Sequence, residues 1–401
     1  MKNDKFRFRL SLSALSKIGL TGLIFQGLNV AIALFRIPLT LKEFGTGEFV
    51  RFSIAIALWP VVAAIGEGLR SFSRQHEKYS RINRKHILIT QTFLWTILFL
   101  LILLEIFSLF PNSEFQSQLS YIILVVAIGI AYIPAGSVIG KIEADHGSAE
   151  VYKIGIFSQV FCLLVTILGV AIQSEFLTLI SFVISPVLTG IILFLRFEKL
   201  YFAKRLNSPN SIEFKGNFSY VSLQLLETFS TFSDLTIVAL ILNEVDAATF
   251  VIFQRFAMIF SLLPSIWNPY TSTLNKSETL TEFRKLRRYV FLSVSIIVIP
   301  CLFFARGFFN TLSEDIPSPP YTLFVFFFSL QWLASSLSPY ISYSSFGLLF
   351  KIRLKLMIIV VVVGVPLKIL LAVDYGYIGI FYVTTIWTIF TAFILRHNMI
   401  R

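Results

Sequence analysis

Long apolar runs recur along the whole chain, and short polar segments separate them. Each run has about 20 residues or more, the length that an α-helix needs to cross the hydrocarbon core of a bilayer. Composition agrees, because 56% of the 401 residues are hydrophobic, 14% are charged and the mean hydropathy is +0.79. A soluble domain has roughly 25% charged residues. The sequence therefore predicts an all-α polytopic membrane protein and argues against a soluble enzyme or a nucleic-acid-binding protein. The twelve predicted spans are 16–39, 50–71, 87–110, 119–140, 152–173, 176–196, 217–242, 247–270, 287–310, 321–345, 353–373 and 376–396.

Lysines and arginines gather on one side of the predicted membrane. The N-terminus and alternate loops hold 28 of the 34, whereas the loops 111–119, 173–176 and 243–248 hold none. Cytoplasmic loops of membrane proteins carry an excess of Lys and Arg. The pattern predicts that both termini are cytoplasmic, and it explains most of the net charge of +12 without a nucleic-acid partner.

A central polar stretch divides the chain into two halves. We predict an N-terminal six-helix lobe over 1–198, a cytoplasmic linker over 199–216 and a C-terminal six-helix lobe over 217–401. The segment 41–52 also resembles 242–253 at the equivalent loop. Two repeats with an even number of spans share one orientation, so we expect a pseudo-two-fold axis along the membrane normal and a site between the lobes.

Four cations are candidates for charge inside the hydrocarbon core, where charge is expensive and often functional. They are Arg36, Arg51, Arg255 and Lys368. If they converge on one cavity, they suit a phosphate or pyrophosphate, because the arginine fork pairs with it in a bidentate manner. Arg36 and Arg51 have an alternative role, since long cationic side chains also extend to the headgroups.

Two carboxylates lie within the span 217–242. Asp234 is near its middle and Glu227 is seven residues earlier, hence on the same helix face. Such carboxylates bind a coupling proton or sodium ion, or they form a structural ion pair. Glu67 is near Arg70, and we expect a local cap or salt bridge there. The histidines show no metal-ligand spacing, and Cys162 and Cys301 lie in apolar runs, so we predict no metal site, no resident cofactor and no disulfide.

The start of the chain resembles bacterial polysaccharide flippases. The resemblance is carried by Ile37–Leu39, Phe44–Phe49, Trp59 and Gly66–Arg70. The family opens with an apolar helix that ends near a proline, a glycine-containing loop, and a second helix that ends in an acidic–glycine element. Glu67 stands where the family more often has Asp. These flippases are O-antigen translocases of the multidrug/oligosaccharidyl-lipid/polysaccharide exporter superfamily.

The resemblance implies a substrate, a location and partners. The substrate is an undecaprenyl-pyrophosphate-linked oligosaccharide, an O-antigen or capsule repeat unit, moved from the cytoplasmic to the outer leaflet of the bacterial inner membrane. The expected partners are the lipid bilayer and, during polysaccharide assembly, a polymerase and chain-length proteins. The resemblance also implies coupling to a H⁺ or Na⁺ gradient, which is common in the superfamily, and Asp234 is the first candidate for the coupling carboxylate.

Two other functions fit a chain of this kind less well. A multidrug and toxin exporter coupled to cations favours an acidic cavity, whereas Arg36, Arg51 and Arg255 are basic. A membrane polysaccharide polymerase or ligase commonly has a long outer loop with catalytic Arg or His. The longest predicted outer loop here, 306–320, has Arg306 as its one cation and no histidine. A transporter without enzymatic activity is therefore the favoured hypothesis.

Overall fold

The computed structural model describes residues 12–75, 95–96, 113–202, 211–271, 279–312, 316, 319–343 and 347–400. Within these ranges all regular structure is helical, which confirms the all-α prediction. The predicted span 87–110 lies outside the described residues except for 95–96.

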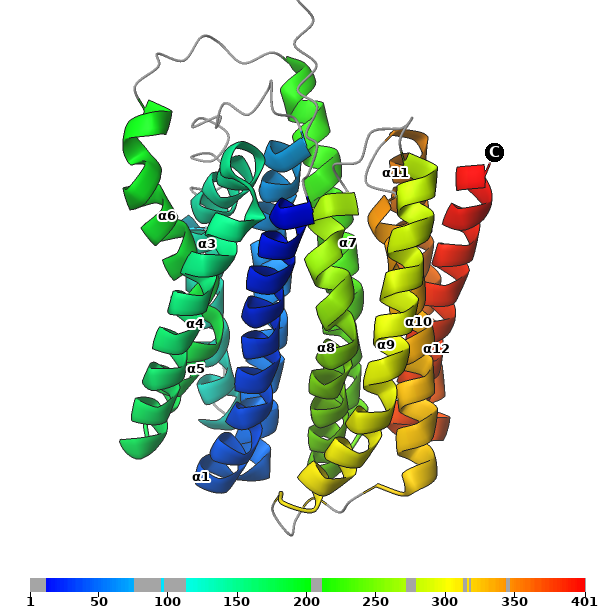
Figure 1. Ribbon diagram of the computed structural model, residues 1–401. Helices are drawn as coiled ribbons and strands as arrows, with labels where there is room; N and C mark the ends of the chain where they lie inside the picture. The colour runs from blue at the N-terminus through cyan, green and yellow to red at the C-terminus, as the bar shows by residue number, and fades with distance from the viewer. Residues whose placement is uncertain are drawn as a thin grey trace, which may run out of the picture.

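The first two predicted spans form one long element, α1 (Leu12–Gln75). Gly45 interrupts it with φ 79° and ψ 175°, a conformation that glycine adopts without steric penalty. In Figure 1 both ends of α1 lie in the upper part of the view, and its turn lies at the bottom. The polar loop expected over 40–49 is therefore reduced to a break at a single glycine.

The next four helices lie together on one side of Figure 1. The predicted span 176–196 is broken between α5 and α6, which are bent by 57°. Pro186 lies at the start of α6, and its missing N–H removes a hydrogen bond that would continue α5. The helices are α3 (Ser113–His146), α4 (Ser148–Ala171), α5 (Glu175–Val183) and α6 (Ser185–Phe202).

The C-terminal half begins with four long helices and ends with a segment that changes its winding. The π-helix η2 (Val360–Gly364) separates α11 from α12, and Gly376 interrupts α12 with φ 59° and ψ −148°. Gly376 therefore marks the boundary between the last two predicted spans. The remaining helices are α7 (Ser211–Ile241), α8 (Glu244–Thr271), α9 (Thr279–Phe309), α10 (Tyr321–Tyr343), α11 (Gly347–Ile359) and α12 (Val365–Ile400).

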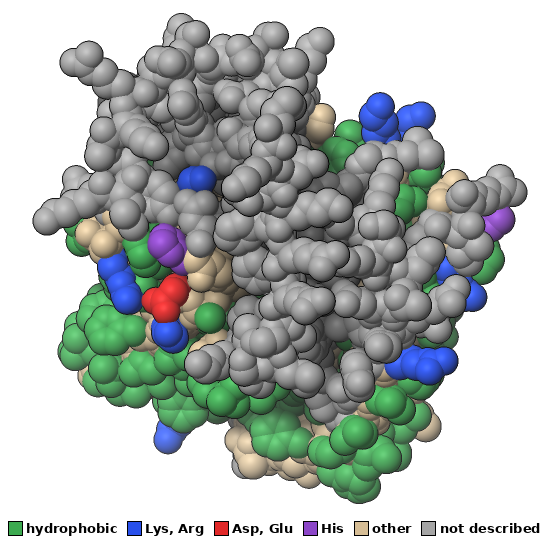
Figure 2. Space-filling model, turned by 45° about the horizontal axis from the view of Figure 1, so that its top comes forward, with side chains coloured by type: hydrophobic (Ala, Val, Ile, Leu, Met, Phe, Trp, Pro, Cys, Tyr) green, Lys and Arg blue, Asp and Glu red, His purple; other side chains and the backbone are tan. Residues whose placement is uncertain are grey.

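Seven helices of the described part are long and apolar enough to cross a membrane, or up to eight if α5 and α6 form one span. Large apolar side chains such as Leu164, Leu240 and Ile296 are exposed on the outside of the bundle, where lipid would cover them. Figure 2 shows several Lys and Arg side chains at the end of the bundle that is uppermost in Figure 1. These observations describe a multi-pass membrane protein.

The two halves meet along α1, α7 and α8, which lie between the outer groups of helices (Figure 1). The largest core cluster joins Phe49 and Val50 of α1 to Phe250 and Phe253 of α8. On α7, Val221 packs so closely against Gly68 that a Cβ at Gly68 would lie 2.7 Å from its Cα. The two halves are therefore closely packed against each other along these three helices.

Candidate functional site

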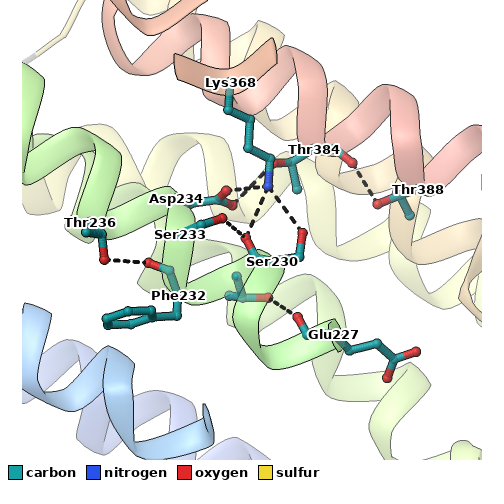
Figure 3. Close-up of polar contacts among 10 residues, drawn as sticks. Glu227, Ser230, Phe232, Ser233, Asp234, Thr236, Lys368, Thr384 and Thr388 are labelled. Atoms are coloured by element: carbon teal, nitrogen blue, oxygen red, sulfur yellow. Dashed lines mark hydrogen bonds and ion pairs between the residues drawn. The ribbon is translucent and has the colours of Figure 1, made fainter. Parts of the chain in front are cut away.

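Asp234 and Lys368 form a buried ion pair in the C-terminal helices. Asp234 of α7 is 4% exposed and Lys368 of α12 is 1% exposed. The Lys368 ammonium donates to Asp234 Oδ1, to the Ser230 carbonyl at 3.1 Å and to Ser230 Oγ at 3.3 Å. Figure 3 shows Lys368 projecting from α12 towards Ser230 and Asp234 on α7. The structure thus brings together two residues that the sequence assigned to different roles.

Two hydroxyl residues, Ser230 and Thr384, supply the remaining hydrogen bonds of the ion pair. Ser230 and Asp234 are four residues apart, so they lie on one face of α7. Thr384, in α12 beyond the Gly376 break, donates to Asp234 Oδ2 at 3.2 Å. The three N–H groups of the ammonium match three oxygen acceptors. Ser230 and Thr384 are not predictable from the sequence, because isolated hydroxyl residues in apolar runs give no signal of their own.

Glu227 belongs to a different ion pair, although it shares a helix face with Asp234. Its Oε1 accepts from Arg353 Nη2 at 2.5 Å and from Arg353 Nε at 2.8 Å. Arg353 of α11 also donates to the Ile341 carbonyl of α10 at 3.0 Å. Glu227 therefore links α7, α10 and α11. Arg353 is the first residue of the predicted span 353–373 and counts among the cytoplasmic-side cations, and only the structure shows this contact.

Arg36 is held by neutral groups of the N-terminal helices. It is 5% exposed, and its Nε donates to Thr166 Oγ1 of α4 at 2.9 Å. Its Nη2 donates to the Ser181 carbonyl of α5 at 2.9 Å, and the guanidinium lies 4.4 Å from the centre of the Phe182 ring. The side chain is directed into the helix bundle by α4 and α5. No carboxylate among the described residues pairs with it.

Arg255 also has no carboxylate partner in the described part of the chain. It lies on α8, is partly buried, and its Nη1 is 4.0 Å from the sulfur of Met258. Thioether sulfur is a weak acceptor and carries no charge. Arg36 and Arg255 are therefore two cations, one from each half of the chain, that form no ion pair with any carboxylate among the described residues.

Arg51 differs from these two because it has a carboxylate partner. Its Nη1 lies 2.6 Å from Glu48 Oε1, and both side chains are partly exposed. Glu48 Oε2 is 3.3 Å from the hydroxyl of Tyr121, which also donates to Glu175. Arg51 is thus part of a polar cluster near the α1 turn.

The expected salt bridge between Glu67 and Arg70 is present, with Arg70 Nη1 3.2 Å from Glu67 Oε1. A stronger partner, Glu143 of α3, was not expected. Its two oxygens accept from Arg70 Nη2 at 2.6 Å and from Nε at 3.1 Å. The bidentate pair joins the ends of α1 and α3, so it explains Arg70 without a ligand.

Among the described residues no group of His, Cys, Asp or Glu could hold a metal ion. Cys162 and Cys301 are buried free thiols. The positions His76 and His86 lie outside the described residues.

No protein-family model and no curated protein matches the sequence. Solved structures do match it over nearly its whole length. An inward-facing multidrug resistance MATE family transporter of the MOP superfamily is 14% identical, with 94% of this chain and 98% of that chain covered and a TM-score of 0.63. The lipid II flippase MurJ, in an inward closed conformation, is 15% identical, with coverage of 95% and 88% and a TM-score of 0.63.

A MOP superfamily transporter from Pyrococcus furiosus, described as having a binding pocket of reverse polarity that suggests a different function, is 14% identical. The match covers 96% of this chain and 95% of that transporter, with a TM-score of 0.59. At these identities the similarity establishes the fold alone. The chain has the fold of MOP superfamily membrane transporters, and the individual side chains have to indicate the ligand.

Proposed function

We propose that this chain is a flippase for an undecaprenyl-pyrophosphate-linked oligosaccharide, such as an O-antigen or capsule repeat unit. It would move its substrate from the cytoplasmic to the outer leaflet of the bacterial inner membrane by alternating access between two six-helix lobes, 1–198 and 217–401, joined by the linker 199–216. The described helices support a transporter fold with a flippase among its structural neighbours.

The observation that carries the proposal is the contrast among the four predicted cations. Lys368 and Arg51 have carboxylate partners, whereas Arg36 and Arg255 have none in the described part of the chain. A buried cation without a counter-ion is costly. A doubly charged pyrophosphate would neutralise both guanidinium groups through charge-assisted hydrogen bonds.

The neutral partners of Arg36 favour this role. Thr166 and the Ser181 carbonyl fix the orientation of the guanidinium but leave its charge intact. These two hydrogen bonds come from Nε and Nη2, so Nη1 would be the group to meet a phosphate oxygen. A cationic drug would be repelled by Arg36 and Arg255, so these residues argue against the multidrug-exporter alternative.

The test is binding of undecaprenyl pyrophosphate to the purified full-length protein. Replacing Arg36 or Arg255 with Met should weaken binding by about 10-fold or more, because a hydrogen bond to a charged group contributes roughly 1.5–3 kcal/mol. The exposed Arg306, which lies over the Tyr321 ring, provides a matched control, and R306M should bind as tightly as the unmodified protein. Unchanged affinity in both R36M and R255M would refute the proposed anion site.

Transport itself is tested in a flippase-null strain. R36M and R255M should fail to restore surface polysaccharide at normal expression, and R306M should restore it. A chain that exports a cationic dye but never restores polysaccharide would support the exporter alternative. Polysaccharide polymerisation by the purified protein would support the enzyme alternative.

The proposed topology places both termini in the cytoplasm. Reporter fusions near Arg81 should give a cytoplasmic signal, and fusions near Gln116 should give a periplasmic one. Reversed signals would contradict the twelve-span arrangement.

Coupling to a H⁺ or Na⁺ gradient through Asp234 or Glu227 stays a prediction. Both carboxylates have cationic partners, Lys368 and Arg353. A coupling ion would therefore have to displace the Lys368 ammonium from Asp234 or the Arg353 guanidinium from Glu227.

A further inference from the structure

The surroundings of the Lys368 ammonium are those of a bound cation. Three oxygens of α7 face it: Asp234 Oδ1, the Ser230 carbonyl oxygen and Ser230 Oγ. We call these three atoms the α7 oxygen cage. Carboxylate, carbonyl and hydroxyl oxygens are the ligands that hard metal cations prefer. The cage therefore has the chemistry of a site for a small monovalent cation, with the ammonium in the place of the ion.

The ammonium reaches the cage from a fixed point in the fold. Lys368 is near the start of α12, directly after the π-helix η2 and Pro366. Such π segments shift the faces of a helix and often occur at functional positions. The side chain is 1% exposed, so the charge is bound in place rather than exchanging with solvent. Its effective concentration at the cage is set by the tether, which gives it an advantage over a free ion.

The second oxygen of Asp234 is also occupied. Thr384 Oγ1 donates to Oδ2, so the carboxylate is bonded on both sides. The pair is electrically neutral, and its hydrogen bonds are satisfied from α7 and α12. A fully satisfied buried network is rigid, and removing one member exposes the others to a large desolvation penalty.

We propose that Lys368 is a tethered cation that fills the α7 oxygen cage, and that the protein binds no free Na⁺ there. Removing the amine and leaving space in its place converts the cage into a Na⁺ site. This inference does not depend on the proposed substrate, since it concerns only ion binding by the C-terminal helices. It predicts that any gradient coupling of this chain does not use Na⁺ at Asp234.

The experiment compares thermal unfolding of the purified full-length protein in NaCl and in choline chloride at equal ionic strength. The unmodified protein should have the same Tm in both salts. K368A should have a higher Tm in NaCl, with saturation, and the rise should be roughly 2 °C at ten times the Kd. The double variant D234N/K368A, which lacks the anionic ligand, should show no difference between the salts.

A second variant separates ion binding from general loss of stability. K368M removes the charge but keeps an unbranched side chain of similar length in the cage, so NaCl should not raise its Tm. A K368A protein that folds only in NaCl would also support the proposal. A K368A protein that unfolds in both salts while D234N/K368A folds would overturn it, because Na⁺ would then have failed to replace the ammonium.

A direct measurement on the unmodified protein gives an independent test. Binding of radioactive ²²Na⁺ should not depend on Asp234, so the unmodified protein and D234N should bind the same amount. Specific binding that D234N abolishes would show that a free ion enters the cage beside Lys368, which contradicts the proposal. Flippase activity plays no part in these measurements, so their failure would leave the proposed substrate untouched.

Discussion

Arg36 and Lys368 are both buried cations of the membrane-embedded helices, but they are neutralised differently. Lys368 pairs with the carboxylate of Asp234 within the C-terminal half. Arg36 bonds only uncharged groups, the Thr166 hydroxyl and the Ser181 carbonyl, among the described residues of the N-terminal half. The difference teaches that charge in an apolar run does not by itself identify a ligand site. A buried cation that pairs with a carboxylate of the protein is already neutralised, whereas a buried cation that bonds only uncharged groups can still bind an external anion.

Arg51 and Arg255, which are only partly buried, differ in the same way: one has a carboxylate partner and the other does not. Arg51 lies beside Glu48, whereas Arg255 contacts the sulfur of Met258. The first pair is local, three residues apart on α1. The second contact leaves the positive charge without a carboxylate partner in the part of the chain that the structure describes. The two unpaired arginines come from different halves of the chain, which places the proposed anion site at their junction.

The largest expected effect is the loss of the Lys368 ammonium with its partner left in place. K368M leaves the Asp234 carboxylate buried and unpaired, and breaking a buried ion pair in this way destabilises a protein by roughly 3–5 kcal/mol. Chemical unfolding in detergent measures the change. The exposed Lys351 of α11 is the matched control, and K351M should unfold like the unmodified protein.

The double variant D234N/K368M sharpens that result. It leaves no uncompensated charge, so it should be less destabilised than K368M alone. Equal destabilisation of the two variants would mean that packing, rather than the ion pair, makes Lys368 important.

A smaller effect is expected for R36M. No carboxylate is left unpaired, and the loss is that of hydrogen bonds to Thr166 and Ser181, about 1–2 kcal/mol. The same unfolding measurement applies. A loss as large as that of K368M would remove the contrast between the two halves and would point to an anionic partner for Arg36.

The Glu227–Arg353 pair should contribute about 1 kcal/mol, because both side chains are partly exposed, at 21% and 13%. E227Q tests this value by unfolding. Glu227 and Asp234 share a face of α7, so E227Q and K368M break ion pairs that differ mainly in how deeply they are buried. If E227Q is as damaging as K368M, burial is not the deciding factor.

The smallest change in stability is expected for R255M, less than about 0.5 kcal/mol, since its contact with Met258 is weak. Its binding of undecaprenyl pyrophosphate should nevertheless fall. A variant that loses stability and keeps its affinity would assign Arg255 a structural role instead.

Much of the fold follows from the sequence, because the apolar runs that require lipid also require helices. The described parts of the predicted spans are helical except at Ile184 and at a few span ends. The breaks are harder to predict: Gly45 shortens an expected loop, and Pro186 divides an expected span. A single glycine or proline in an apolar run is compatible with a continuous helix, and packing against neighbours decides whether the helix bends.

The candidate site was predictable only in part. Arg36, Asp234, Arg255 and Lys368 are identifiable because charge is rare in apolar runs. Apart from the Asp234–Lys368 pair and the contact of Arg255 with the Met258 sulfur, the groups that bond them are hydroxyls and carbonyls, which apolar runs contain in large numbers. The role of Arg353 was also not predictable, because a cation near a helix end fits the ordinary excess of Lys and Arg on the cytoplasmic side.

The sequence by itself determined that the chain is an all-α membrane protein and which few charges lie within its helices, since both follow from the cost of moving polar groups into hydrocarbon. The tertiary structure alone decided that Lys368 meets Asp234 while Arg36 and Arg255 meet no described carboxylate. Lys368 and Asp234 are 134 residues apart, and their pairing depends on how α7 and α12 pack. Hydropathy is a property of each segment, whereas charge neutralisation is a property of the contacts between segments.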